Sequence, residues 1–374
     1  MDVLKLANVV KAAAREAGFD ICGISPAGEF RELEYFPRWI AEGRAGEMSY
    51  LAKRDDQGRL KRSSLAVAAP WARSVVVCAI NYNSPQPYST ELTDRSRGWI
   101  SRYAWTNTDY HEAVLRRLRE VEAKLIAQAS AQPKEIELRT WCYVDTGPVV
   151  ERVFAQHSGV GWVGKNTCII NQGIGSWLFL GVILTSLDLV PDLPAPDRCG
   201  TCSACLDACP TNAFIAPYQL DATKCISYLT IEKRGEIPEE LREGMGRNIF
   251  GCDICQDVCP WNREAPVGRA PEFAPREGLQ APSLKWMAEM TVDEFRETFR
   301  HSPVKRAKFS GLKRNTAIAM GNSGNLEFAG HLRKLAEDDD ESVAEHARWA
   351  LGELERRRHL GEDERTDMQK SAQK

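Results

Sequence analysis

The sequence lacks a long apolar run, an apolar leader and a strong net charge. Its longest apolar stretch, Trp177 to Thr185, covers about nine residues, whereas a membrane-spanning helix needs roughly 20. Asp2 and Lys5 interrupt the N-terminal segment, which reads as an amphipathic helix and not as a secretory leader. A net charge of -3 argues against coating nucleic acid by bulk charge. These absences predict a cytoplasmic protein without membrane contact.

Length and composition indicate a globular protein of several domains. With 374 residues, 43% apolar and 27% charged, the chain is too long for one ordinary core. Proline-rich stretches at 190–197 and 265–282 mark candidate boundaries, and the end of the chain has no apolar pattern. The predicted division is residues 1–190, 191–265 and 280–360, followed by a disordered tail at 361–374.

The first part of the chain alternates helical and strand patterns. Tyr110–Ala129 has apolar residues along one side of a long helix, and Ser74–Asn81 is an apolar run typical of a strand. A mixed α/β domain is therefore expected. The other predicted elements are helices at Asp2–Gly18 and Thr146–His157, and strands at Ile21–Ala27, Thr167–Asn171 and Ser176–Thr185, the last two joined by a tight turn.

The C-terminal part contains an internal repeat. The ten residues from Asn315 and the ten from His346 superimpose at a 31-residue shift, which places Gly321 on Gly352. Another helical pattern, Leu326–Leu335, lies between them. Small-apolar helix pairs at this period are typical of HEAT-type repeats. The alternative is two unrelated amphipathic helices.

Twelve cysteines are unusual for a cytoplasmic chain, where disulfides are rare. Eight of them lie between Cys199 and Cys259. The first four, Cys199, Cys202, Cys205 and Cys209, form a C-x2-C-x2-C-x3-C-P run. This spacing lets three thiolates hold one four-iron cluster while the fourth binds another. The alternative, a structural zinc site, normally uses two separated cysteine pairs.

A second set, Cys252, Cys255 and Cys259, lacks one cysteine relative to the first, and Cys225 is the natural replacement. A three-cysteine cluster with Cys225 free is the alternative. Crossing the ligands as in two-cluster ferredoxins gives a definite assignment. One cluster takes Cys199, Cys202, Cys205 and Cys259, and the other takes Cys209, Cys225, Cys252 and Cys255.

Two such clusters carry electrons one at a time but have no substrate site of their own. The remaining residues must therefore supply a redox partner. The other four cysteines lie in strand-like or apolar contexts, where small buried side chains are expected. They are Cys22, Cys78, Cys142 and Cys168.

The candidate active site lies in the first domain. Asp145 follows a strand pattern, where it either caps a helix or transfers a proton, if burial raises its pKa. Lys165 and Asn166 lie in a glycine-punctuated loop and either hold a ligand or shape a turn. His111 follows Asp109 as in a cobalt-binding Asp-x-His motif. The glycine that completes the motif is absent, so His111 is interpreted as a pocket residue.

The sequence resembles the epoxyqueuosine reductases, cobalamin-dependent iron–sulphur enzymes that complete queuosine in tRNA. The resemblance rests on residues 144–148 with Glu151-Arg152, on 161–167, on 216–221, on 225–232 and on 251–262. It implies an α+β fold: a cobalamin-binding α/β domain, a ferredoxin-like two-cluster module and C-terminal HEAT-like helices.

The resemblance also implies the cofactors and the site. Two [4Fe-4S] clusters would pass electrons from an external one-electron reductant to cobalamin, and Asp145 would act as general acid. The protein is expected to act as a monomer on tRNA with epoxyqueuosine in its anticodon loop. The expected cofactor-binding residues are Tyr103, Asp109, His111, Trp162, Lys165, Asn166, Ser176 and Ser227.

A basic rim is expected to hold the tRNA backbone. The candidates at the start of the repeats are Lys305, Arg306, Lys308, Lys313 and Arg314. A second group comprises Lys53, Arg54, Lys61 and Arg62. The alternative is that these are ordinary solvated charges.

Two other functions compete with this hypothesis. A corrinoid reductive dehalogenase-like enzyme would use the same cofactors, but a small substrate does not need helical repeats. A ferredoxin-type electron carrier would bind the clusters and no corrinoid.

Overall fold

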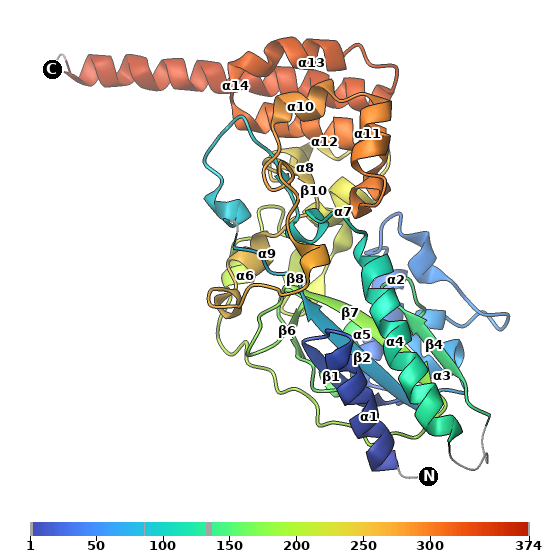
Figure 1. Ribbon diagram of the computed structural model, residues 1–374. Coiled ribbons are helices and arrows are strands. Elements are labelled where there is room, and N and C mark those ends of the chain that lie inside the picture. Colours follow the sequence, from blue (N-terminus) through green and yellow to red (C-terminus); the bar gives the residue numbers. More distant parts are fainter. Residues whose placement is uncertain (1–2, 86, 132–136, 373–374) are drawn as a thin grey trace.

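The computed structural model describes residues 3–85, 87–131 and 137–372, with side chains as far as residue 358. At its centre is a four-stranded sheet in the order β1-β2-β7-β4, in which every neighbouring pair is antiparallel (Figure 1). The strands are β1 (Ile21–Pro26), β2 (Ser74–Asn81), β7 (Leu178–Thr185) and β4 (Thr140–Tyr143).

Both faces of this sheet are covered, which explains the continuous apolar run of β2. Val76 and Ile80 point into one core, whereas Val75 and Val77 point into the other, as the two-residue period of a strand requires. A strand covered on both sides needs apolar residues at every position. One layer contains α1 (Val3–Glu16) and α4 (Tyr110–Ser130), and the other contains α3 (Leu65–Ala68) and α5 (Glu151–His157).

The cysteine-rich segment forms short elements beside the sheet domain. Its strand β10 (Asn248–Phe250) pairs in parallel with β3 (Trp99–Ile100), which comes from the first 190 residues. This strand pair therefore joins residues from both sides of the domain boundary predicted near residue 190. The other elements are α6 (Ala204–Asp207), β8 (Phe214–Ala216), β9 (Gln219–Leu220), α7 (Ile226–Ile231), α8 (Glu239–Arg242) and α9 (Ile254–Asp257).

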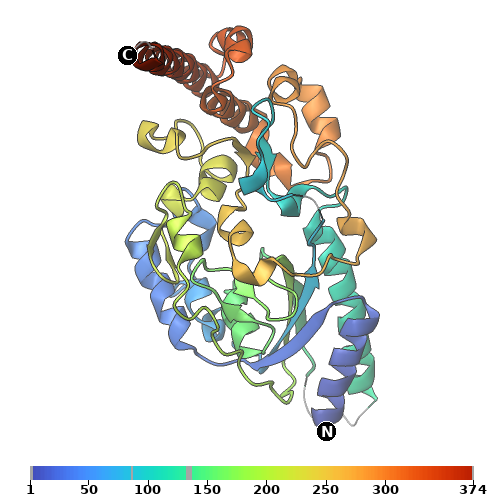
Figure 2. The same ribbon diagram turned by 90° about the vertical axis from the view of Figure 1, so that its left-hand side faces the viewer.

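The C-terminal helices pack at the opposite end of the molecule from the N-terminus (Figure 2). They are α10 (Leu284–Glu289), α11 (Val292–Thr298), α12 (Lys308–Ser323), α13 (Ala329–Leu335) and α14 (Glu341–Ala372). Mixed helix and strand content is thus confirmed, while the HEAT-like character of these helices stays a prediction. Among the described residues, no helix is both long and apolar enough to cross a membrane.

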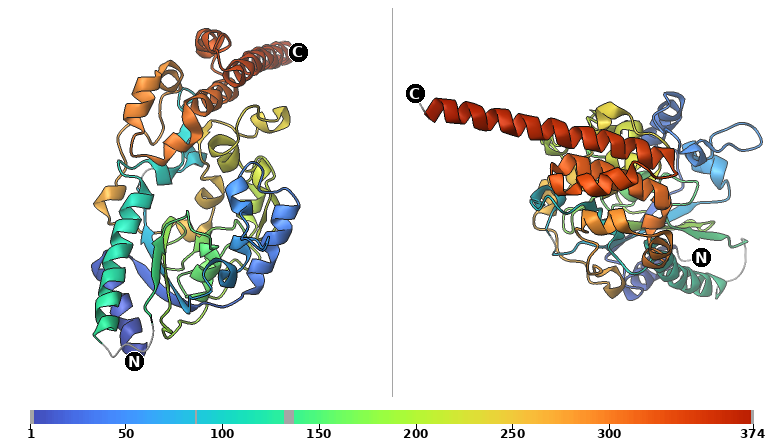
Figure 3. Two further views of the ribbon diagram at one scale, coloured as in Figure 1. Left: turned by 90° about the vertical axis from the view of Figure 1, so that its right-hand side faces the viewer. Right: turned by 90° about the horizontal axis from the view of Figure 1, so that it is seen from above.

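Three local predictions differ from the structure. The helix predicted from Thr146 begins at Glu151, because Gly147 packs directly under the Tyr143 ring and the chain bends there. Strand β6 (Ile169–Ile170) pairs with β5 (Trp162–Val163) and not with β7. Finally, α14 runs through Ala372 across the tail predicted to be disordered and projects beyond the other helices (Figure 3). Glu, Arg and Lys favour a helix even without an apolar face.

Candidate active site and cluster module

Asp145 lies on the loop between β4 and α5 with a left-handed backbone, φ 58°, a conformation that costs a non-glycine residue energy. The Tyr110 hydroxyl donates to its Oδ2 over 3.0 Å, and His111 Nε2 lies 3.6 Å from the same oxygen. Helix α5 is capped at Val150 without a side-chain hydrogen bond. The interpretation of Asp145 as a helix cap is therefore wrong, and its carboxylate is free to face other groups.

A chain of alternating charges leads to Asp145. Asp109 caps α4 by accepting from the His111 backbone N–H, and its Oδ1 lies 2.7 Å from His111 Nδ1. Lys305 Nζ lies 3.4 Å from the other oxygen of Asp109. Both ring nitrogens of His111 thus face carboxylates, which fits a pocket residue and not a cobalt ligand.

These charges set the protonation of the site. Burial would lower the pKa of His111, but Asp109 and Asp145 raise it to about 9. Desolvation would raise the pKa of Asp145, but the nearby charge of His111 and the hydrogen bond from Tyr110 outweigh it and lower that pKa to about 2. At neutral pH the pair is an imidazolium and a carboxylate. The condition named for Asp145 as a proton donor, a pKa raised by burial, is therefore not met, and a proton must reach it from another group.

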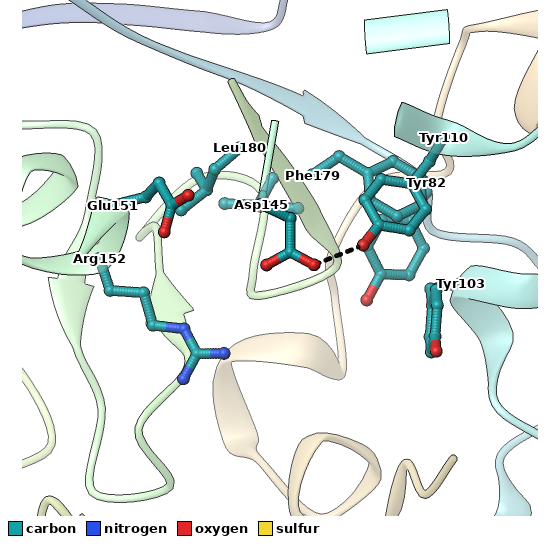
Figure 4. Close-up of a pocket in the computed structure, with 9 residues that line it drawn as sticks. Tyr82, Tyr103, Tyr110, Asp145, Glu151, Arg152, Phe179 and Leu180 are labelled. Carbon is teal, nitrogen blue, oxygen red and sulfur yellow. Dashed lines mark hydrogen bonds between the residues drawn. The ribbon is translucent and has the colours of Figure 1, made fainter. Parts of the chain in front are cut away.

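Asp145 opens into a cavity of about 260 Å³ with a largely aromatic wall (Figure 4). The Tyr110 ring stacks on Phe179, with 4.5 Å between centroids and 3° between planes. Phe179 in turn stacks on Tyr82. The cavity is lined by Tyr82, Tyr103, Tyr110, Asp145, Glu151, Arg152, Leu178, Phe179 and Leu180.

A second cavity of about 650 Å³ lies on the other side of the Asp145 loop, whose residues Val144 and Thr146 line it. Asp109 and His111 contribute to its wall, and the exposed ring of Trp141 does as well. Three basic residues complete the lining: Lys305, Arg306 and Lys308.

The cysteines of the cluster module gather around two places, and their assignment as ligands of two clusters stays a prediction. Cys199, Cys202, Cys205 and Cys259 line one cavity of about 250 Å³. In the second group, burial and the charges of Cys225 and Cys209 raise the pKa of Cys252. The pKa of Cys255 is raised first by a hydrogen bond with Cys168 and by burial, and then by Cys252 and Cys225. Thiols gathered around two centres suit cluster ligation, in which the ligands are thiolates. Cys225 thus lies near Cys252 of the second predicted group, and its role as a cluster ligand stays a prediction.

Comparison with known proteins agrees with this geometry. Residues 198–262 match the family described as 4Fe-4S double cluster binding domain, and residues 62–146 match Epoxyqueuosine reductase QueG, DUF1730. Epoxyqueuosine reductase of Xanthomonas campestris pv. campestris is 38% identical, covering 92% of this chain and 95% of the relative. That of Leadbetterella byssophila is 42% identical, covering 83% and 96%. The chain belongs to the epoxyqueuosine reductase family. It is an oxidoreductase with two [4Fe-4S] clusters.

Solved structures of the epoxyqueuosine reductase family have the same fold. A crystal structure with an epoxyqueuosine-modified tRNA stem loop is 30% identical, with a TM-score of 0.81, covering 94% of this chain and 90% of that one. The Bacillus subtilis enzyme, with an aspartate-containing catalytic loop swung out of the active site, is 30% identical. Its TM-score is 0.79, and the match covers 94% and 90%.

In this member of the family, several predicted cofactor-binding residues lie on the cluster module and not around Asp145. Lys165 Nζ donates to the backbone oxygens of Gly200 and Cys202, over 2.7 and 2.8 Å. Asn166 donates to the Cys255 backbone oxygen over 3.3 Å. Each of these contacts fixes a ligand loop.

The remaining predicted residues divide between the two sites. The Ser176 backbone N–H donates to Asn262, the Trp162 ring meets Trp261 edge-on, and the Ser227 backbone N–H faces the Cys225 thiol. Only Tyr103 of the predicted set joins Asp145 in the first cavity, whereas Asp109 and His111 line the second.

Five residues that line the Asp145 cavity have no role predicted from the sequence. Tyr110, Glu151 and Arg152 stand inside the quoted motifs, but no pattern separates them from ordinary helix-start residues. Tyr82 and Phe179 lie at the end of one strand and the start of another. The pairing of those strands, which a single sequence does not reveal, brings them together.

Proposed function

We propose that this protein reduces epoxyqueuosine to queuosine in tRNA, the last step of queuosine biosynthesis. The observation that carries the proposal is the position of Asp145 between a cavity beside the cluster module and a second cavity with basic residues in its wall. The family's name and the family member bound to a modified stem loop support it. They do not favour the dehalogenase-like or the electron-carrier alternative.

The second cavity suits a nucleotide that leaves the anticodon loop. A base must be splayed out of its stack to reach a buried reactive group. Trp141, with 41% of its surface exposed, offers a face for stacking, and Lys305 and Lys308 offer charges for phosphates. Lys313 and Arg314 are buried, 8% and 1% exposed, and bond to backbone oxygens. We therefore remove these two from the proposed tRNA surface.

The second basic group extends the same surface. Arg306 lies over the ring of Tyr50 in η2 (Ser49–Ala52), at 5.2 Å from its centroid. Arg62, in η3 (Lys61–Ser63), donates to the backbone oxygen of Asp145 over 3.4 Å. Lys53 and Lys61 are exposed beside these contacts. Two basic segments that are far apart in sequence, one around Arg62 and one around Arg306, therefore both lie beside the Asp145 loop.

The first cavity suits the flat corrin ring of cobalamin. Tyr103, Tyr110 and Phe179 supply an aromatic wall for one face of the ring. Tyr103 also lies against the cluster loop, because a Cβ on Gly251 would meet its ring at 3.6 Å. When bound there, cobalamin would supply two-electron cobalt chemistry at the epoxide carbon.

The chain's own residues manage the protons. Asp145 protonates the departing oxygen as general acid, and His111 holds the proton that reaches it, because the pair at neutral pH is an imidazolium and a carboxylate. Tyr110 fixes the carboxylate by donating to Oδ2. The strained backbone of Asp145 favours movement of its loop, as in the B. subtilis enzyme.

Conversion of a defined substrate tests the proposal. Anaerobically prepared protein is supplied with cobalamin, an excess of titanium(III) citrate and an epoxyqueuosine stem loop, and the loss of one oxygen is followed by mass. Asp145→Ala should reduce kcat by ~10²–10⁴-fold while iron and cobalt contents stay unchanged. Glu120→Gln, an exposed change on α4, is the control. Unchanged turnover in Asp145→Ala would remove Asp145 from the mechanism.

We infer a cytoplasmic monomer that receives electrons from an external one-electron reductant. The C-terminal helices are proposed to form HEAT-like repeats. They would also support the tRNA, because Lys308, the first residue of α12, lines the second cavity.

A further inference from the structure

Glu151 is a second carboxyl group in the Asp145 cavity. It is the first residue of α5, six positions after Asp145, and both side chains line the same cavity. Figure 4 shows both carboxyl groups turned into the cavity, with the Arg152 guanidinium below them. Glu151 Oε1 is buried without a hydrogen-bond partner among the described residues. A buried carboxylate oxygen with no donor is costly, whereas a neutral carboxyl group is not.

The groups around Glu151 favour its neutral form. Burial and the negative charge of Asp145 raise the pKa of Glu151 to about 8, although Arg62 of η3 and Arg152 of α5 oppose this shift. Tyr143 of β4 also faces Glu151 and is uncharged because burial raises its pKa. Burial likewise raises the pKa of the cavity tyrosines Tyr82, Tyr103 and Tyr110. At neutral pH the site therefore holds one proton on His111 and one on Glu151.

The proposed reaction consumes two protons. Removing the epoxide oxygen breaks two C–O bonds, forms the alkene and releases water, which requires two electrons and two protons. The clusters and the external reductant supply the electrons. We propose that Glu151 is the second proton source: it passes its proton to Asp145 inside the cavity, after Asp145 has delivered the proton held by His111. This inference rests on the proposed function.

After each proton transfer, one named group has lost its proton and must regain one. Once Asp145 has given up the first proton, His111 is neutral and Asp145 is again a carboxylate. The Glu151 proton then restores the acid form of Asp145, which protonates the oxygen a second time. Glu151 and His111 regain protons from solvent before the next turnover. Glu151 thus acts through Asp145 and does not need to touch the substrate.

The pH dependence of turnover tests this order. With titanium(III) citrate in excess, kcat of the unchanged protein should fall as pH rises through about 8. Glu151→Gln should reduce kcat at pH 7 at least tenfold. Its remaining activity should fall only as pH approaches about 9, where His111 loses its proton. Glu151→Asp, which keeps an ionisable proton, should recover part of the rate, and Glu120→Gln should match the unchanged protein.

A measurement without any cofactor separates this inference from the proposed function. Infrared spectra of cofactor-free protein at pH 7 should contain the carbonyl band of a protonated carboxyl group. Because buried Asp257 also has a raised pKa, about 7, the test is the difference spectrum: the unchanged protein minus Glu151→Gln should contain the band, and the unchanged protein minus Glu120→Gln should not. If the unchanged protein does not convert the stem loop, the proposed function fails, while this band still reports the proton on Glu151.

Two results would overturn the inference. One is a Glu151→Gln protein whose kcat and pH profile equal those of the unchanged protein. The other is a Glu151→Gln protein that binds cobalamin more weakly but reaches full kcat when saturated, since Glu151 would then only hold the corrin ring.

Discussion

At the scale of single residues, the sequence identifies Asp145 but not its charge. The motif around it predicts a functional carboxyl group, and the structure places it in a cavity. The charge depends on His111, which lies 34 positions earlier on α4 and reaches Asp145 only after the sheet and α4 have packed. The pKa of a side chain follows from its neighbours in space, so a single sequence could not supply it.

The His111 network should make stability depend on pH. The folded-state pKa of His111 is raised from 6.5 to about 9, so its contribution is fully present below the unfolded pKa and is lost as pH rises through the folded one. His111→Gln should lower the free energy of unfolding by roughly 1–3 kcal/mol at pH 6, and by much less at pH 9.5. Urea unfolding of cofactor-free protein measures this difference. An equal loss at both pH values would contradict the assigned network.

At the scale of elements, the sequence pattern predicts the bounds of a helix or strand well when the apolar residues of that element alone define its buried face. Strand β2 has the predicted bounds, and α4 ends one residue beyond its predicted end. The segment from Thr167 to Thr185 has the pattern of a hairpin, yet β6 pairs with β5 while β7 joins the central sheet. Strand partners are chosen by packing over long distances, which periodicity does not encode.

The internal repeat shows a similar limit, because its two matched glycines have different surroundings. A Cβ on Gly321 would lie 2.8 Å from the Cβ of Ala350 on α14, whereas a Cβ on Gly352 would meet nothing within 4 Å. Gly321→Ala should therefore destabilise the protein by about 1–3 kcal/mol through overpacking. Gly352→Ala, the same chemical change, should be neutral or stabilise by up to ~1 kcal/mol. Thermal unfolding compares the two, and equal effects would contradict the close packing of α12 on α14.

At the scale of the whole molecule, the sequence predicted the types of module but not how they interlock. The cysteine spacing predicted both groups of ligands. The pairing of β3 with β10, and the hydrogen bond that the Glu47 backbone N–H donates to the Tyr228 hydroxyl, join the first part of the chain to the cluster module. The residues that make these contacts are far apart in sequence. The contacts hold the Asp145 cavity beside the cluster module.

The proposed tRNA surface should appear in the salt dependence of binding. Each phosphate contact that is lost reduces the slope of log K against log salt by about 1. Lys61→Gln combined with Lys308→Gln should weaken stem-loop binding and flatten this slope by about 2. Lys334→Gln, an exposed change on α13, should leave the slope unchanged. Fluorescence anisotropy from 50 to 300 mM salt measures it, and an unchanged slope in the double variant would exclude this surface.

The central claim is that electrons pass from the two clusters to a cavity in which Asp145 protonates the departing oxygen. The most direct measurement mixes the fully reduced, cobalamin-loaded protein with an epoxyqueuosine stem loop and no further reductant. Reoxidation of the clusters and product formation are followed together. The account predicts one queuosine for every two electrons lost, at matching rates, in the unchanged protein and neither event in Asp145→Ala. Queuosine formed while the clusters stay reduced would contradict it.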